Sequence, residues 1–240
     1  MTESTGYVRA WEEFWRDAPP EPGGVLWDAP AQETVAHHLP MFEEQFDVEL
    51  PLIDVGCGNG TQSRYLAQRF GRVLGVDLSH AAIARARGAD RAGVAEYRQL
   101  DAANLPAVRA LHAELGDANV YLRGVLHQCD SRDLPRVAEA IALLVGERGR
   151  AFVVELAEEA GRVLRGLAQG PAGPPPKLAA VFQHGIAPGE VSDQAIPALL
   201  TAARLRVLAS GELPLATTES GPDGERIVLP SAWWLVARGA

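Results

Sequence analysis

Three aspartates stand at or near the ends of short apolar segments, where side chains are placed to meet a ligand. Asp54 lies inside an apolar run, Asp77 ends a second run, and Asp101 closes a third segment. An acid about 20 residues after a glycine turn can bind ribose hydroxyls in strand–helix–strand nucleotide sites. The third carboxylate, or its adjoining backbone, could accept a hydrogen bond from an adenine amino group. The spacing therefore indicates a site for an adenosine-containing ligand.

The turn beside the first aspartate has glycine at every second position, in the order Gly56, Cys57, Gly58, Asn59 and Gly60. Glycine is needed there because the turn requires positive φ and because a ligand must approach bare backbone. A helical pattern follows, and the free N–H groups of its first turn point into the same crevice. The turn lacks the third glycine of a dinucleotide fingerprint and the Lys-Ser/Thr pair of a P-loop.

His127 is the best candidate for a general base, because an imidazole can accept a proton at neutral pH. It follows a predicted strand over 119–126, and ligands bind off the carboxyl ends of strands in an open parallel sheet. Arg123 and Gln128 are expected to face the same site. The alternative is that His127 hydrogen-bonds to backbone or packs near an adenosine. Glu155, near the end of the next strand, could reach the site or bind a neighbouring loop.

The elements that position these residues alternate between strands and helices. Short apolar runs predict strands at 52–55, 73–77, 94–100, 119–126, 151–156, 205–216 and 227–237. The last two are joined by a turn-rich segment and must run antiparallel. Adjacent Trp233 and Trp234 face opposite sides of the last strand, so at least one is expected in the core. On the predicted helix 81–87, Arg85 and Arg87 are expected to be solvated. The fold predicted is a doubly wound, seven-stranded α/β sheet, mostly parallel with an antiparallel C-terminal strand.

The segments LIDVGCGNGTQSRYLA, GVDLS and QLDAANL, in this order, resemble the class I S-adenosylmethionine-dependent methyltransferases. The resemblance covers roughly residues 51–156 and implies S-adenosylmethionine as cofactor and methyl transfer as activity. It implies that the glycine turn holds the methionine end, Asp77 the ribose, Asp101 the adenine side, and Asp54 the amino group. The full cofactor set predicted is Asp54, Gly56, Cys57, Gly58, Asn59, Gly60, Asp77, Leu78, Asp101, Ala102 and Arg123.

One departure from the family pattern reduces the range of methyl acceptors to be expected. Members that methylate amino groups often carry an Asn/Asp-Pro-Pro-Tyr motif after the fourth strand, and this chain has Arg-Gly-Val-Leu-His there. Methylation of DNA, glutamine or exocyclic amines by that motif is therefore not expected. The competing interpretations of the core are a dinucleotide-binding oxidoreductase and a related fold that binds nothing.

The N-terminal segment 1–46 is expected to form a helical cap on a methyltransferase domain spanning 47–240. Tyr7, Trp11 and Trp15 share one face of a helix, which either docks on the core or closes over the site as a lid. Aromatic rings suit a sulfonium, because a cation over a ring gains about 0.5–2 kcal/mol. Further along, adjacent His37 and His38 are expected on a polar face.

The segment about 157–190 is interrupted by glycine and proline and is expected to cover the substrate. The substrate-binding set predicted is Tyr7, Trp11, Trp15, Trp27, Gln128, Phe182 and His184. An aromatic flank of this kind fits a small apolar or aromatic molecule, such as a secondary metabolite. The competing function is a protein that binds the cofactor but cyclises or rearranges its substrate, or that only binds.

Composition excludes several partners. The net charge of −9 argues against a general nucleic-acid binder, which needs a basic face. No apolar run is long enough for a membrane span, and the start has no secretory signal pattern, so a cytoplasmic monomer or homodimer is expected. Cys129 and His127 alone are poor zinc spacing, so no metal site is predicted.

Overall fold

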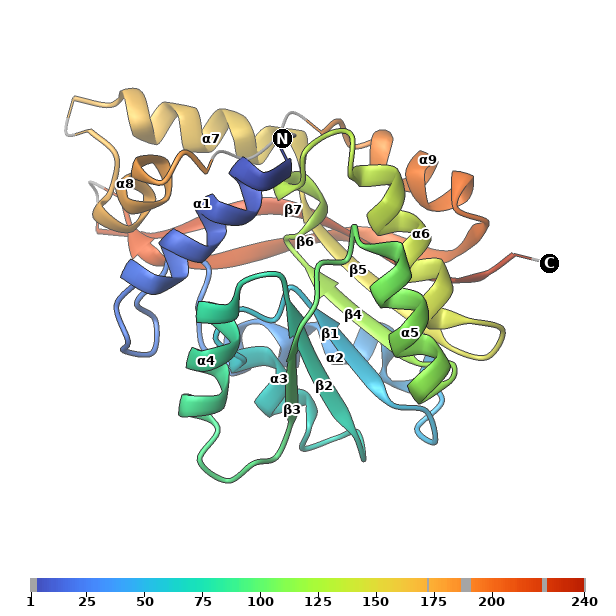
Figure 1. The fold of residues 1–240 in the computed structure, drawn as a ribbon. Coiled ribbons are helices and arrows are strands. Elements are labelled where there is room, and N and C mark those ends of the chain that lie inside the picture. Colours follow the sequence, from blue (N-terminus) through green and yellow to red (C-terminus); the bar gives the residue numbers. More distant parts are fainter. Residues whose placement is uncertain (1–3, 172, 187–190, 222–223, 240) are drawn as a thin grey trace.

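One sheet of seven strands forms the centre of the described chain (Figure 1). The computed structural model describes residues 4–171, 173–186, 191–221 and 224–239; the other positions, which fall in the predicted cap, substrate cover and C-terminal hairpin, lie outside it. The strands are β1 Leu52–Val55, β2 Val73–Asp77, β3 Glu96–Gln99, β4 Asn119–Arg123, β5 Arg150–Leu156, β6 Leu205–Ser220 and β7 Arg226–Arg238. Their order is β3-β2-β1-β4-β5-β7-β6, which confirms the predicted doubly wound sheet.

The strand order reverses between β1 and β4, which pair in parallel with Val55 opposite Leu122. On its other side β1 pairs in parallel with β2, with Val55 opposite Val76. Chains leaving the ends of β1 and β4 turn to opposite faces of the sheet, and this opens a crevice where ligands bind in α/β folds. Both Asp54 and Asp77 lie beside this crevice.

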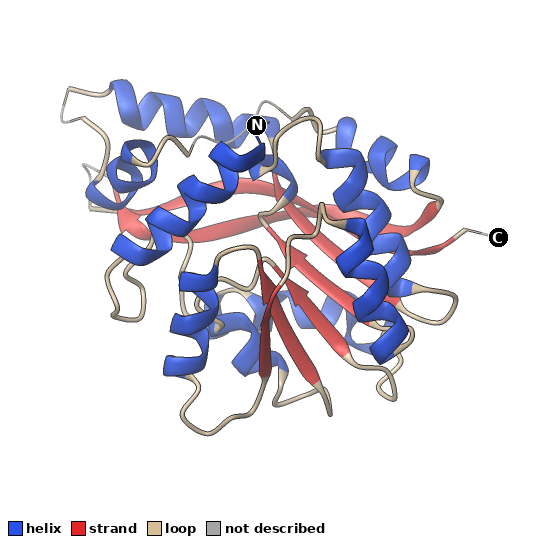
Figure 2. Ribbon diagram, in the orientation of Figure 1, coloured by secondary structure: helices blue, strands red, loops and turns tan. Residues whose placement is uncertain are grey.

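Helices cover both faces of the sheet (Figure 2). They are α1 Ser4–Asp17, α2 Val35–Phe42, α3 Thr61–Leu66, α4 His80–Ala89, α5 Leu105–Leu115, α6 Leu134–Val145, α7 Glu158–Gln169, α8 Pro176–Gln183 and α9 Ala195–Ala202, with 3₁₀ turns η1 Ala31–Glu33, η2 Glu43–Gln45 and η3 Leu126–Gln128. Apolar side chains of α5, α6 and α9 pack on one face, and those of α2 and α3 on the other. Trp234 is buried in the first of these cores, as predicted for at least one of the tryptophan pair. None of the helices in the described ranges is long and apolar enough to cross a bilayer.

The C-terminal hairpin is longer than the sheet that it joins. β5 stops pairing with β7 at Leu156 opposite Ser231, whereas β6 and β7 continue to Ser220 opposite Arg226. Along this extension, Leu215 and Thr217 are buried on the same side of β6. Figure 1 shows α1, α7 and α8 gathered near the extended hairpin. These elements form a roof over the carboxyl ends of the central strands.

The polar face predicted for the two histidines of α2 is wrong for His38. Its side chain is 3% exposed, and its Nδ1 lies 2.8 Å from the hydroxyl of Tyr121. Burial lowers the pKa of His38 to about 3, so the ring is neutral. The tyrosine of β4 supplies a hydrogen-bond partner inside the core, and only the folded chain brings the two residues together.

Candidate cofactor and substrate site

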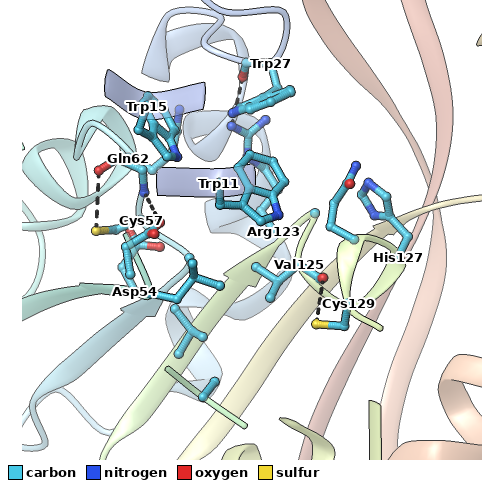
Figure 3. Close-up of a pocket in the computed structure, with 18 of the residues that line it drawn as sticks. Trp11, Trp15, Trp27, Asp54, Cys57, Gln62, Arg123, Val125, His127 and Cys129 are labelled. Carbon is cyan, nitrogen blue, oxygen red and sulfur yellow. Dashed lines mark hydrogen bonds between the residues drawn. The ribbon is translucent and has the colours of Figure 1, made fainter. Parts of the chain in front are cut away.

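A pocket opens at the carboxyl ends of β1, β2 and β4, with residues of α1 on one wall (Figure 3). All members of the predicted cofactor set line it except Gly60. Of the predicted substrate set, Tyr7, Trp11, Trp15, Trp27 and Gln128 line it. One pocket therefore contains both groups of residues.

The glycine turn leaves backbone open to this pocket at Gly56. Gly56 has φ 71° and is exposed, and a Cβ there would lie 2.4 Å from Cγ2 of Val125. Gly58, with φ 54°, is covered instead by the indole of Trp15, whose Cζ2 would be 2.7 Å from an added Cβ. Trp15 therefore contacts the predicted cofactor turn, although its sequence position suggested the substrate side.

Gly60 serves the turn and does not line the pocket. It is the N-cap of α3 with φ 75°, and an added Cβ would meet the ring of Tyr97 at 2.8 Å. Its predicted contact with the cofactor stays a prediction. The glycine is needed because left-handed backbone and close packing coincide there.

Asp77 is buried with both carboxylate oxygens turned to backbone N–H groups. Oδ2 accepts from Gly58 at 3.0 Å and Oδ1 from Ser79 at 2.9 Å. Burial raises the pKa of Asp77 to about 6, against the opposing effect of these hydrogen bonds. The carboxylate thus connects the end of β2 to the glycine turn and keeps acceptor capacity for a ligand.

Asp54 and Asp101 differ in their surroundings. Asp54 is buried and accepts a 2.5 Å hydrogen bond from the hydroxyl of Ser63, and burial raises its pKa to about 6. Asp101 is half-buried at the pocket edge and accepts from the N–H of Ala103 at 2.9 Å. Both aspartates line the pocket, as expected from the sequence.

Gln62 and Arg123, which line the pocket, each carry a buried donor without a hydrogen-bond partner among the described residues, as does Nε1 of Trp11. Gln62 uses its oxygen to accept from Thr34 Oγ1 at 2.8 Å, which leaves its Nε2 unpaired. Arg123 donates from Nη2 to the carbonyl of Trp27 at 3.0 Å, and its buried Nη1 is unpaired. A buried donor left unsatisfied costs about 1–3 kcal/mol, so this pair of donors indicates a ligand with acceptor oxygens.

Asp28 and Gln62 were not predicted as site residues. Asp28 accepts from the side-chain amide of Asn59 at 2.7 Å and from the N–H of Gly23 at 2.9 Å, which attaches the N-terminal loop to the glycine turn. Gln62 follows the glycine turn by two positions, so its place in the first turn of α3 is a signal that the sequence contains. The place of Asp28 depends on how its loop folds back.

His127 and Glu155 form a buried pair. Figure 3 shows His127 on the opposite side of the pocket from Cys57 of the glycine turn. Nδ1 of His127 lies 2.6 Å from Oε2 of Glu155, and the side chains are 8% and 0% exposed. From the sequence, Glu155 could either reach the site or bind a neighbouring loop. In the structure its side chain binds the loop after β4. Through His127, that loop contributes to the pocket wall.

Five aromatic rings join α1 to the loop before α2: Tyr7, Trp11, Phe14 and Trp15 of the helix and Trp27 of the loop. Trp11 and Trp15 lie 5.6 and 6.4 Å from the ring of Trp27, and Tyr7 lies 6.4 Å from Trp11. Because rings of this size bury large apolar areas, the cluster holds α1 against the pocket. The helix covers the site in the described structure, and its action as a lid remains a prediction.

Polar contacts hold α1 against the neighbouring helix α4 at two places. Glu12 accepts from Ser79 Oγ at 2.8 Å and from the N–H of Ala81 at 3.1 Å, at the N-terminus of α4. Arg85 donates to the carbonyls of Trp15 at 2.5 Å and Arg16 at 3.1 Å, at the C-terminus of α1. The expectation that Arg85 is solvated is therefore wrong, because its guanidinium satisfies carbonyls that the end of a helix leaves free.

Replacing Arg85 with methionine should loosen α1 without emptying the core. We expect a loss of about 1–3 kcal/mol in unfolding free energy, because several hydrogen bonds to a charged donor disappear. Hydrogen exchange should accelerate in α1 more than in the sheet. Arg91→Met, at an exposed position after α4, is the matched control. Equal exchange in both variants would contradict a role for Arg85 in fixing α1.

Beyond the carboxylates the pocket becomes aliphatic. Its lining there comes mainly from α7, α8 and the extended hairpin, with one residue from the loop before η1 and one from the end of β5, and comprises Leu26, Leu156, Leu164, Leu178, Val181, Leu215 and Leu229, with Thr217. The one hydroxyl among them is satisfied, because Thr217 donates to the carbonyl of Ile227 at 2.7 Å. This part of the pocket, which we call the aliphatic chamber, suits an apolar group.

Phe182 and His184, predicted to contact substrate, do not line the pocket. Phe182 packs against the apolar cluster behind it. His184 donates from Nε2 to Oδ2 of Asp17 at 3.1 Å and packs edge-on against Phe14 at 5.6 Å, so it links α8 to α1. Neighbouring positions on the inner face of α8, Leu178 and Val181, line the chamber instead.

Comparison with known proteins identifies the fold and the family. A family model described as "Methyltransferase domain" matches residues 52–149. The crystal structure of an S-adenosylmethionine-dependent methyltransferase from Anabaena variabilis superposes with a TM-score of 0.90 at 32% identity, covering 96% of this chain and 94% of that one. The chain belongs to the class I S-adenosylmethionine-dependent methyltransferases.

More distant members of the methyltransferase fold are also similar. A structure titled for conversion of a disulfide bond into a thioacetal group during echinomycin biosynthesis has a TM-score of 0.66 at 20% identity, covering 100% of this chain and 93% of that one. Magnesium protoporphyrin IX methyltransferase from Synechocystis has a TM-score of 0.59 at 17% identity, covering 99% of this chain and 96% of that one. At these identities the likeness extends to the fold alone. A comparison with curated protein sequences gives no match.

The cofactor of this methyltransferase family member is S-adenosylmethionine. The described pocket fits that molecule chemically. Acceptor carboxylates stand beside open backbone at Gly56, and unpaired donors of Gln62 and Arg123 face the same space. The sulfonium would be surrounded by tryptophan rings and carboxylates, both of which favour a cation.

Proposed function

We propose that the protein transfers the methyl group of S-adenosylmethionine to a small, mainly apolar acceptor. The observation that carries this proposal is the continuity of one pocket from Asp54 and Asp77 to the aliphatic chamber. A cofactor at the carboxylates would direct its reactive end toward a space with apolar walls. Most of the chamber lining belongs to α7, α8 and the extended hairpin, and all of it lies outside the segment matched by the family model.

Within the cofactor half, we assign the ribose hydroxyls to Asp77 and the adenine edge to Asp101 and Ala102. The sulfonium and the amino group fall to the region of Asp54 and the open backbone at Gly56. These assignments rest on the family resemblance and on the place of each side chain in the pocket. S-adenosylmethionine supplies an activated methyl group when bound, so the protein mainly has to align the acceptor and exclude water.

We assign the carboxylate of the cofactor's methionine portion to the unpaired donors of Arg123 and Gln62. Arg123→Met should weaken S-adenosylhomocysteine binding about 10- to 100-fold, the value of one hydrogen bond to a charged group. Binding of 5′-methylthioadenosine, which lacks that carboxylate, should change much less. Isothermal titration with both ligands, beside Arg91→Met as control, separates this role from a general loss of fold. An equal loss for both ligands would contradict it.

The activity itself is tested by incubating the protein with labelled S-adenosylmethionine and panels of apolar acceptors. Formation of S-adenosylhomocysteine together with a methylated acceptor supports methyl transfer. Consumption of acceptor without methylation supports the competing function, a cyclisation or rearrangement near the sulfonium. Tight NAD(P) binding without S-adenosylmethionine binding would revive the oxidoreductase interpretation.

A further inference from the structure

Glu155 is a fully buried carboxylate surrounded by donors from one loop. It lies near the end of β5, and its side chain is 0% exposed. Oε1 accepts from the N–H groups of Val125 and Leu126 at 2.9 and 2.8 Å, and Oε2 accepts from the N–H of His127 at 3.1 Å. Three backbone donors satisfy the ionised form, so the carboxylate acts only as an acceptor.

The acceptor state of Glu155 fixes the tautomer of His127. Because Oε2 lies 2.6 Å from Nδ1, that nitrogen must carry the proton and donate it. The lone pair of the neutral ring is then on Nε2, which has no partner among the described residues. His127 lines the pocket, so this basic nitrogen is available to a molecule bound there.

The thiol and the phenol that line the pocket near the loop after β4 are poor bases at neutral pH. Burial raises the pKa of the Cys129 thiol to about 12, and it raises the pKa of the Tyr7 hydroxyl, so both stay protonated. Asp133, at the N-terminus of α6, is turned toward Arg136 at 3.3 Å. Asp54 and Asp77 belong to the cofactor half. His127 therefore combines a free lone pair with a place in the pocket wall.

We propose that His127, held by Glu155, removes a proton from the acceptor, and that the acceptor group is a hydroxyl on a mainly apolar molecule. The inference rests on the proposed methyl transfer. The hydroxyl oxygen forms a bond to the methyl carbon while the carbon–sulfur bond breaks and its electron pair stays on sulfur. The proton passes from the oxygen to Nε2, and the imidazolium remains paired with Glu155 until it releases the proton to water.

The pair selects a hydroxyl over other acceptors for a chemical reason. A carboxylate is already ionised at neutral pH and gains nothing from a base, whereas a hydroxyl must lose its proton as the new bond forms. Among the described residues that line the aliphatic chamber, no side chain has an unpaired polar group that could bind a charged part of the acceptor. Glu155 touches neither substrate nor cofactor in this scheme, and so it is a positioning residue.

The tautomer can be measured without turnover. In ¹⁵N-histidine-labelled protein with S-adenosylhomocysteine, His127 should give the neutral Nδ1–H pattern at pH 8. Glu155→Gln should move it toward Nε2–H, because the amide nitrogen can donate to Nδ1. An Nε2–H pattern in the wild-type protein would overturn the proposal. This wild-type result does not depend on whether the Glu155→Gln variant folds. An unchanged pattern in a folded Glu155→Gln variant would also overturn it.

Turnover of three compounds of one shape tests the acceptor: 1-naphthol, 1-naphthylamine and 1-naphthoic acid. We expect methylation of 1-naphthol, with kcat reduced roughly 10²- to 10⁴-fold in His127→Gln and partly restored at high pH, where naphthol ionises. The exposed His37→Gln is the matched control. Faster methylation of the naphthoic acid, or a His127→Gln variant with normal kcat and pH profile, would overturn the proposal. Binding of cofactor without methylation of any compound would count against the proposed function. The measured tautomer of His127 would still show whether Glu155 holds the ring as proposed.

Discussion

Replacing Asp77 with asparagine should weaken S-adenosylhomocysteine binding by roughly 100-fold or more. If Asp77 holds the ribose, the change removes a charged acceptor from two hydroxyls, and hydrogen bonds to charged groups contribute about 1.5–3 kcal/mol each. Asparagine is preferable to alanine because Asp77 also accepts from Gly58 and Ser79. The asparagine amide has the shape of the carboxylate and keeps one acceptor oxygen, so it disturbs the glycine turn less than alanine would. Isothermal titration measures the loss.

The chain offers a matched control in Asp90. This aspartate is also buried and accepts from the N–H groups of Val94 and Ala95 at 3.1 and 2.9 Å, yet it does not line the pocket. Asp90→Asn should lose stability and keep cofactor affinity. Undiminished binding in Asp77→Asn would remove the basis of the proposed cofactor assignment.

The affinity for cofactor should also fall as the pH drops through about 6, where the pKa values of Asp54 and Asp77 lie. A protonated carboxyl is a weaker acceptor for hydroxyls and no longer attracts a sulfonium. Stability changes in the opposite direction: because both pKa values are raised above their ordinary value near 3.8, these groups favour the fold at low pH. That contribution is lost as the pH rises from about 4 through 6. Titrations at pH 5, 6 and 7 with wild type and Asp77→Asn test the assignment, since the variant's dependence should be shallower.

Replacing Gly56 with alanine should abolish cofactor binding and destabilise the protein. The residue has φ 71°, and an added Cβ would lie 2.4 Å from Cγ2 of Val125. Left-handed backbone costs a non-glycine residue about 1–2 kcal/mol, and overpacking adds about 1–3 kcal/mol. The new methyl group also stands where the turn exposes bare backbone to the pocket. Chemical denaturation and cofactor titration together measure both effects.

Gly93→Ala separates the cost of left-handed backbone from the cost of overpacking against Val125. Gly93 has φ 63° but no heavy atom within 4 Å of an added Cβ, and it lies away from the pocket. It should show the backbone cost alone and bind cofactor normally. If Gly56→Ala were no less stable than Gly93→Ala and bound cofactor equally well, the close approach of Val125 would have no functional meaning.

Local patterns in the chain were enough to predict the seven strands, the glycine turn and the aspartates at the strand ends. Short apolar runs, glycine spacing and an acid after a strand are properties of a few consecutive residues. Parallel strands align their carboxyl ends, so Asp54, Asp77 and Asp101 had to come near one another once the sheet was predicted. The same local reasoning placed His127 near that edge.

Only the tertiary structure decided which polar groups are partners and what builds the chamber. Glu155 could have turned either way, and the pairing of β4 with β5 brings it to the loop of His127. Trp15 lies on Gly58, and Arg85 on the end of α1, because α1 packs across α4. The sequence indicates which faces are apolar and where the chain turns. The partner of a buried polar side chain depends on which distant segments the packed core brings within hydrogen-bonding distance, and periodicity along one chain contains no such distances.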